Sequence, residues 1–157
     1  DRLVRADREV DVFEYTLQRI LLRHLEPVFG GAGTPSVRHK TLKPVLPRCV
    51  ELLSCLAYWG TESLPDARRA FTSGFHELRE GVAPGIMSVE QCGLETVDRA
   101  LDELIAVGPR LKKKLMAACT ACIACDGRVT VEESELLRAV ADSLGCPLPP
   151  LGASQAD

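Results

Sequence analysis

Residues 109–145 read PRLKKKLMAACTACIACDGRVTVEESELLRAVADSLG, and this stretch decides the fold class. Its apolar residues recur every three or four positions, first over residues 109–125 and again over residues 130–144, which is the period of an amphipathic helix. The pair Asp126-Gly127 lies between the two parts, and both residue types favour a tight turn. The stretch therefore predicts two helices joined by a short turn.

The turn and the start of the second helix carry a pattern that occurs twice in the chain. Residues 126–133 read DGRVTVEE and residues 7–14 read DREVDVFE, so both fit D-x-x-V-[DT]-V-x-E. Ordinary helix capping explains part of this pattern, because Thr130 or Asp11 caps the helix and a glutamate three residues later completes a capping box. The repeat predicts two similar helix-loop-helix units.

Capping does not explain the direction of the two glutamates. On a helical wheel Glu133 is in line with Leu137, and Glu14 is in line with Leu17, so we expect both carboxylates to lean toward the core. A buried carboxylate needs hydrogen-bond donors or a cation. Two interpretations stay open at this point: capping alone, or a site for a hard cation, Ca²⁺ or Mg²⁺, where the two units pack as a pseudo-twofold pair. The ligands of that cation site would be Asp7, Glu14, Asp126 and Glu133.

The rest of the chain has the same helical character. Periodicity, N-capping residues and Pro/Gly breaks predict further helices over residues 11–25, 47–58, 63–79 and 88–107, about six or seven in all. Ser63 and Ser88 are the expected N-caps of the last two, and Ser88 also begins a capping box. We expect an all-α bundle as a single domain over residues 1–145, with a long internal connection over residues 30–46 and a Pro-rich tail over residues 146–157.

Composition agrees with this class and excludes others. The chain has 157 residues, of which 46% are hydrophobic and 4% aromatic, and that balance favours packed helices around one core. A net charge of -3 argues against nucleic acid as a partner. No apolar run approaches the roughly 18 residues that span a bilayer, so we expect no membrane insertion. Because the chain begins at Asp1 rather than Met, we expect it to be part of a longer protein.

The seven cysteines allow two interpretations. Cys119, Cys122 and Cys125 follow a C-x-x-C-x-x-C spacing, with Cys146 downstream, and iron-sulfur ligands occur at similar spacings. The three lie within a helical apolar pattern, however, which favours small thiols packed in the core. An odd number of cysteines without a secretion signal also indicates reduced thiols rather than a disulfide framework.

Motifs for catalysis are missing from the sequence. The string HELRE at residues 76–80 lacks the second histidine of a zinc-protease helix, and no phosphate-binding or serine-nucleophile motif occurs. We therefore expect no enzyme activity from this chain alone. Tyr58 and Trp59 precede Gly60 and are either a core anchor or a patch that docks a partner.

The acidic turn at residues 126–133, with its degenerate copy at residues 7–14, resembles the turn of the TerB-like (tellurite-resistance) helical domain. The segment from Leu115 through the acidic turn to the Cys146-Pro147-Leu148-Pro149-Pro150 ending is also similar to the C-terminal cytosolic region of bacterial membrane zinc metallopeptidases of the CAAX-prenyl-protease and HtpX type. Arg8 departs from the pattern, since it stands where the turn glycine is expected.

The resemblance implies a function outside catalysis. It suggests an accessory or regulatory domain of a membrane-bound zinc metallopeptidase, which binds the rest of its own polypeptide, another protein or a cation. The catalytic zinc and the membrane helices would lie outside these residues, so the domain would be cytoplasmic and tethered to the inner membrane. The alternative is a free-standing TerB-like protein for metal binding or stress response, in which the acidic residues are themselves the functional site.

Overall fold

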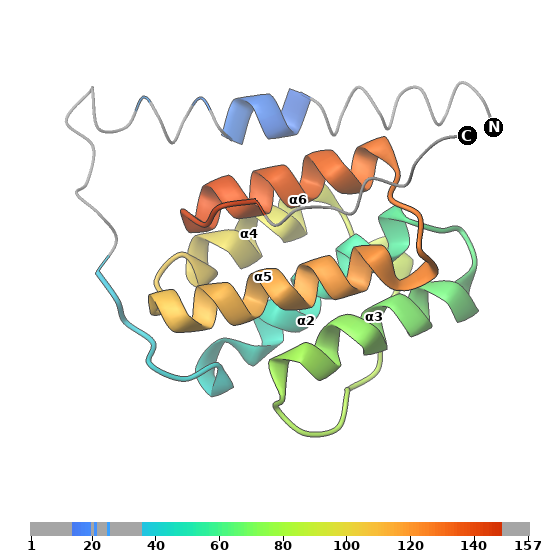
Figure 1. The fold of residues 1–157 in the computed structure, drawn as a ribbon, viewed down its shortest axis with the longest axis horizontal. Helices are drawn as coiled ribbons and strands as arrows, with labels where there is room; N and C mark the ends of the chain where they lie inside the picture. Colours follow the sequence, from blue (N-terminus) through green and yellow to red (C-terminus); the bar gives the residue numbers. More distant parts are fainter. Residues whose placement is uncertain (1–13, 20, 22–24, 26–35, 149–157) are drawn as a thin grey trace.

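The computed structural model describes residues 14–19, 21, 25 and 36–148. Within these residues the fold is all-helical, which confirms the predicted class, and β pairing is limited to an isolated bridge between His39 and Val107. Residues 14–19 are helical, and the labelled helices of Figure 1 are α2 (Leu46–Trp59), α3 (Leu64–Leu78), α4 (Leu94–Leu104), α5 (Pro109–Ile123) and α6 (Val131–Leu144). Short 3-10 turns occupy Lys43–Val45, Val89–Gln91 and Ala124–Asp126. Among the described helices, none combines the length and the apolar character that crossing a bilayer requires.

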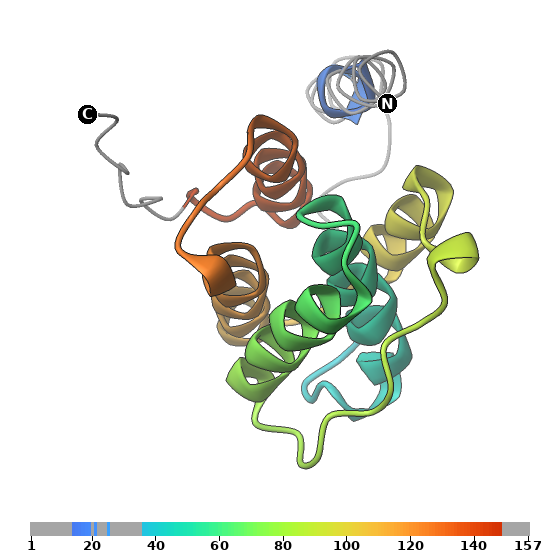
Figure 2. The same cartoon turned by 90° about the vertical axis from the view of Figure 1, so that its right-hand side faces the viewer.

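Helix α2 is the centre of the bundle. It packs against α3, α4, α5 and α6, and Figure 2 shows the other helices arranged around it. Six consecutive side chains, at residues 52–57, are buried, so α2 is covered on all sides. A helix that is apolar all round is stable only inside a core. This position confirms the expectation that the segment over residues 47–58 is central.

Helices α3 and α5 make the most extensive pairing in the bundle. Gly74 of α3 lies at the point of closest approach, where a Cβ atom would be 2.7 Å from the carbonyl oxygen of Ala118 and 2.8 Å from the Cβ of Cys122. Phe71 and Phe75 flank this contact on α3 and are fully buried. Glycine is therefore required by space, even though it is a poor helix former.

The connection expected over residues 30–46 is structured at its C-terminal end. The backbone N–H of Arg38 donates to the carbonyl of Ala106 (2.8 Å), and the N–H of Gly108 donates to the carbonyl of His39 (3.1 Å). These bonds attach the connection to the end of α4. The 3-10 turn at Lys43–Val45 follows and buries Val45, so the expected loop is wrong for these last residues.

The helix expected over residues 88–107 is divided. The 3-10 turn Val89–Gln91 ends at Cys92, whose backbone is extended (φ -98°, ψ 102°), and α4 begins after an extended Gly93. The capping box predicted at Ser88 is wrong, because the Ser88 side chain caps no backbone N–H. Thr96 instead donates its hydroxyl to the carbonyl of Gln91 (2.9 Å), which stabilises the break. Ser63 does occupy the N-cap position of α3, but its side chain makes no capping bond.

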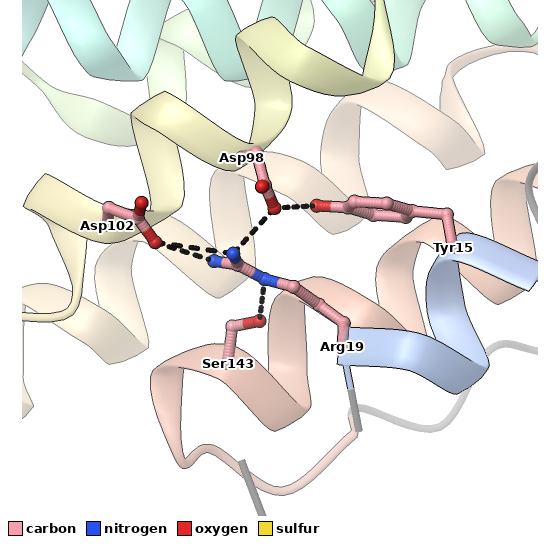
Figure 3. Close-up of polar contacts among 5 residues, drawn as sticks. All are labelled: Tyr15, Arg19, Asp98, Asp102 and Ser143. Carbon is pink, nitrogen blue, oxygen red and sulfur yellow. Dashed lines mark hydrogen bonds and ion pairs between the residues drawn. The ribbon is translucent and has the colours of Figure 1, made fainter. Parts of the chain in front are cut away.

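Polar contacts attach the N-terminal helical segment to the bundle. Figure 3 shows Arg19 between α4 and α6, where it forms ion pairs with Asp98 (2.5 Å) and Asp102 (3.2 Å) and donates to Ser143 Oγ (3.3 Å). Tyr15 donates its hydroxyl to the same Asp98 (3.1 Å), and burial raises the pKa of Tyr15. This side chain therefore stays a neutral donor at physiological pH.

This attachment reverses the orientation expected for the segment. Leu17, Leu21 and Leu25, which the periodicity places on the core side, are 48%, 49% and 44% exposed. The inward face instead carries Tyr15, Arg19 and the buried Thr16, whose hydroxyl donates to the carbonyl of Glu135 (3.2 Å). The expectation was wrong because hydrogen bonds and ion pairs, rather than apolar burial, determine which face of this helix packs against the bundle.

Candidate functional site

The C-terminal end of α2 lies between two hollows in the surface. The first, here called the aromatic cavity, has a volume of about 440 Å³ and is lined by Tyr58, Trp59 and residues 89–96. The second, here called the acidic hollow, measures about 110 Å³. Asp126 and Glu133 line the acidic hollow together with Gly60, so both pairs of candidate residues from the sequence lie near the C-terminal end of α2.

Hydrogen bonds from α2 hold the wall of the aromatic cavity in place. Tyr58 donates its hydroxyl to the carbonyl of Met87 (2.9 Å), and the N–H of Met87 donates to Ser54 Oγ (3.2 Å). Burial raises the pKa of Tyr58, which keeps this donor protonated. The loop before α4 is thus attached to α2 at two points, and the cavity is built into the fold.

The cavity combines aromatic surface with negative charge. Tyr58 and Trp59 are half-buried and leave part of their ring surface accessible. Glu90 and Glu95 are the charged residues among those that line the cavity, and both are exposed. Hydrogen bonds from its own backbone N–H and from Ser88 lower the pKa of Glu90, so this carboxyl group is ionised at neutral pH. The arrangement suits a cationic group placed against an aromatic ring.

The acidic hollow is built by the turn that the sequence predicts. Gly127 adopts the left-handed conformation (φ 79°), and Asp126 accepts a hydrogen bond from the N–H of Arg128 (2.9 Å). Thr130 caps α6 by accepting from the N–H of Glu133 (3.2 Å), and Glu133 Oε2 accepts from the N–H of Thr130 (2.8 Å). The predicted capping box is therefore confirmed.

Glu133 is buried, as the helical wheel predicts, with 6% of its surface exposed. Its Oε1 lies against Gly60 at the end of α2, where a Cβ atom would come within 2.1 Å of this oxygen. Burial raises the pKa of Glu133, and the hydrogen bonds from Thr130 only partly offset that effect. Glu133 therefore contributes both a cap for α6 and a carboxyl group in an unfavourable environment for charge.

The raised pKa predicts how Glu133 affects stability at different pH values. A carboxyl group whose pKa is higher in the folded state stabilises the fold when protonated, below its ordinary pKa of 4.5, and loses that contribution as pH rises through the folded-state value. Glu133→Gln removes the titration, so the melting temperature of the variant relative to wild type should increase as pH rises above 4.5. Thermal unfolding between pH 4 and pH 8 measures this. An equal difference in melting temperature at every pH would contradict this expectation. Glu77→Gln, which removes an exposed carboxylate on α3, is the control.

The four candidate cation ligands do not all come together in the described structure. Asp126 and Glu133 share the acidic hollow with Asp66, whose carboxylate forms an ion pair with Arg69 (2.6 Å). Glu14 is exposed and does not line this hollow, contrary to the expectation that it leans toward the core, and Asp7 lies outside the described residues. Within the described ranges, no group of three or more histidine, cysteine or acidic side chains gathers as metal ligands. The Ca²⁺ or Mg²⁺ site therefore stays a prediction.

The seven cysteines form no disulfide within the described residues, and they do not all pack in the core. Helix α5 ends at Ile123 rather than at residue 125, because the chain continues as a 3-10 turn. Cys119 and Cys122 are buried on α5, whereas Cys125 is exposed in the turn. The expectation of a core position is correct for the first two and wrong for Cys125.

No family model, curated protein or solved structure matches this chain. The resemblance to TerB-like domains and to metallopeptidase tails therefore stays a prediction. The support for a candidate site comes from the two hollows near the C-terminal end of α2.

Sequence reasoning identified one wall of the aromatic cavity and missed the other. Tyr58 and Trp59 are candidates for partner binding, whereas Glu90, Cys92 and Glu95 lie within the helical stretch expected over residues 88–107 and are not candidates. Gly93 was the signal for the missed wall, since an isolated glycine within a helical pattern often marks a break.

Proposed function

We propose that this chain is a non-catalytic binding module, and that its aromatic cavity binds an arginine or lysine side chain on a segment of a protein partner. The observation that carries the proposal is the composition of the cavity, which sets Tyr58 and Trp59 beside Glu90 and Glu95 with no basic residue among those that line it. A cavity of about 440 Å³ lies in the range of small-ligand pockets.

Two interactions would favour a basic side chain over a neutral one. A guanidinium or ammonium group over the face of Trp or Tyr gains about 0.5–2 kcal/mol. The carboxylates of Glu90 and Glu95 add a further attraction that salt weakens. The chain's net charge of -3 acts in the same direction over longer distances.

We infer that the partner is the rest of the chain's own polypeptide or another protein. The resemblance to metallopeptidase tails supports an accessory role beside a membrane-bound zinc metallopeptidase, with the catalytic zinc outside these residues and the module on the cytoplasmic side. The alternative, a free-standing TerB-like protein that binds a metal, is supported by the shared position of Asp126 and Glu133 in the acidic hollow.

The fluorescence of Trp59 tests the basic-ligand proposal directly, because Trp59 is the single tryptophan of the chain. The probe is the blocked peptide N-acetyl-Ala-Arg-Ala-amide, with N-acetyl-Ala-Ala-Ala-amide as the neutral comparison. We expect a saturable change in fluorescence with the arginine peptide, and weaker binding of this peptide to Glu90→Gln/Glu95→Gln than to wild type.

The control variant is Glu77→Gln, which removes an exposed carboxylate on α3 outside the aromatic cavity. Glu77→Gln should bind the arginine peptide with the affinity of wild type. A higher salt concentration should weaken the binding of this peptide to wild type and to Glu77→Gln alike. Equal affinity for the two peptides, or an unchanged affinity in the double variant, would overturn the proposal.

A further inference from the structure

Two cysteines from distant parts of the chain are neighbours beside the aromatic cavity. Cys55 belongs to α2 and is fully buried, whereas Cys92 follows the 3-10 turn Val89–Gln91, is half-buried and lines the cavity. The Sγ atom of Cys55 lies 4.0 Å from the carbonyl oxygen of Gly93. The sulfur of Cys55 therefore lies against the backbone immediately after Cys92.

The two thiols are not equivalent. Hydrogen bonding from Cys55 stabilises the thiolate of Cys92 and lowers the pKa of Cys92, whereas the same interaction, together with burial, raises the pKa of Cys55. The thiolate is the nucleophilic form of cysteine. Cys92 is also the member that an oxidant can reach, because it is half-buried and lines the cavity, whereas Cys55 is fully buried.

Other thiols of the chain have different environments. Burial raises the pKa of Cys49 to about 12 and the pKa of Cys119 well above its ordinary value, so both remain protonated inside the core. Cys125 is exposed in the turn before α6. These three provide internal comparisons for reactivity at Cys92.

We propose that Cys55 and Cys92 are a redox-active pair that a hydroperoxide converts into a reversible disulfide, with Cys92 as the attacking thiol and Cys55 as the resolving thiol. Low-pKa, accessible cysteines next to a second thiol are the arrangement found in redox sensors. The chemistry requires no ligand in the aromatic cavity and is independent of the function proposed above.

The reaction has two steps, written here for hydrogen peroxide. The Cys92 thiolate attacks one peroxide oxygen, an S–O bond forms, the O–O bond breaks, and the hydroxide that leaves takes a proton to become water. Cys92 is thereby oxidised by two electrons to sulfenic acid, and the peroxide is reduced. The sulfur of Cys55 then attacks Sγ of Cys92, the S–S bond forms, the S–O bond breaks, and the departing hydroxide combines with the proton of Cys55 as a second water.

The test treats the full chain with hydrogen peroxide, blocks the remaining thiols with N-ethylmaleimide and maps non-reduced peptides by mass spectrometry. We expect a peptide linked through Cys55 and Cys92, which dithiothreitol separates again. Cys49 and Cys119 should carry the maleimide label in the same sample. A disulfide to Cys125 or Cys146 in its place, or no intramolecular disulfide, would overturn the proposal.

Three variants assign the roles of the two thiols. Cys92→Ser should abolish the linked peptide and leave Cys55 unoxidised. Cys55→Ala, which avoids placing a hydroxyl in the core, should instead accumulate Cys92 sulfenic acid, detected with dimedone. Cys125→Ser is the matched control and should retain the linked peptide in full. Sulfenic acid on Cys55 in the Cys92→Ser variant would reverse the assignment and contradict the proposal.

Discussion

Gly74→Ala should lower the stability of the chain by about 1–3 kcal/mol, the usual cost of adding a methyl group to a packed interior. The new Cβ would lie 2.7 Å from the Ala118 carbonyl oxygen and 2.8 Å from the Cys122 Cβ. Because a carbonyl oxygen and a Cβ atom move only with the backbone of α5, the contact between α3 and α5 has to open. Alanine is the better helix former by about 1 kcal/mol, which reduces the net loss without cancelling it.

Chemical denaturation of Gly74→Ala, measured by circular dichroism, checks this expectation. Gly85→Ala is the matched control, because a Cβ at residue 85 meets no atom within 4 Å and the backbone there has no positive φ. Stability equal to or above that of wild type in Gly74→Ala would show that α3 and α5 do not approach as closely as described.

Gly60→Ala is expected to cost about 1–2 kcal/mol, for a different reason. A Cβ at residue 60 would come within 2.1 Å of Glu133 Oε1, so the carboxylate has to leave its position. Glu133 would then lose its bond to the N–H of Thr130 and with it one half of the capping box of α6. Loss of an N-terminal capping interaction costs typically about 1 kcal/mol.

A double-mutant cycle with Glu133→Ala distinguishes this mechanism from a local effect at the end of α2. If the collision with Glu133 is the cause, Gly60→Ala should cost much less in the Glu133→Ala background, giving a coupling energy of about 0.5–2 kcal/mol. Equal costs in the two backgrounds would contradict the mechanism. Gly93→Ala, at a glycine with no atom within 4 Å of its Cβ position, is the control.

The parts of the fold that were predictable are those that depend on neighbouring residues. The capping box of Thr130 and Glu133 involves residues three apart, and the turn at Gly127 depends on one glycine, so both could be read from local sequence. The central position of α2 also followed from its composition. In these segments the local sequence preference and the tertiary packing favour the same structure.

The predictions from sequence were wrong where tertiary contacts override the helical periodicity of a segment. The break before α4 depends on Tyr58 reaching Met87 and on Thr96 reaching back to Gln91, which periodicity cannot show. The N-terminal segment has a regular leucine stripe, yet Arg19 and its partners on α4 and α6 determine the buried face. Tertiary hydrogen bonds decided both outcomes.

The candidate site was predictable to a similar extent. Tyr58, Trp59 and Glu133 were identified because aromatic residues are rare in this chain and because the helical wheel places Glu133 inward. Cys55 and Cys92 were not paired, since 36 residues separate them and their meeting depends on how the loop before α4 folds back on α2. Sequence alone contains no local signal for such a pair.

The central position of α2 also has a consequence for folding during translation. Synthesis of α2 is complete at Trp59, but α6, which completes its cover, begins only at Val131. At about 5–20 residues per second, synthesis of the intervening segment takes roughly 4–15 s. During that interval the cover of α2 is incomplete, so we expect chaperones that bind nascent chains to act there and translation pauses within this interval to promote aggregation.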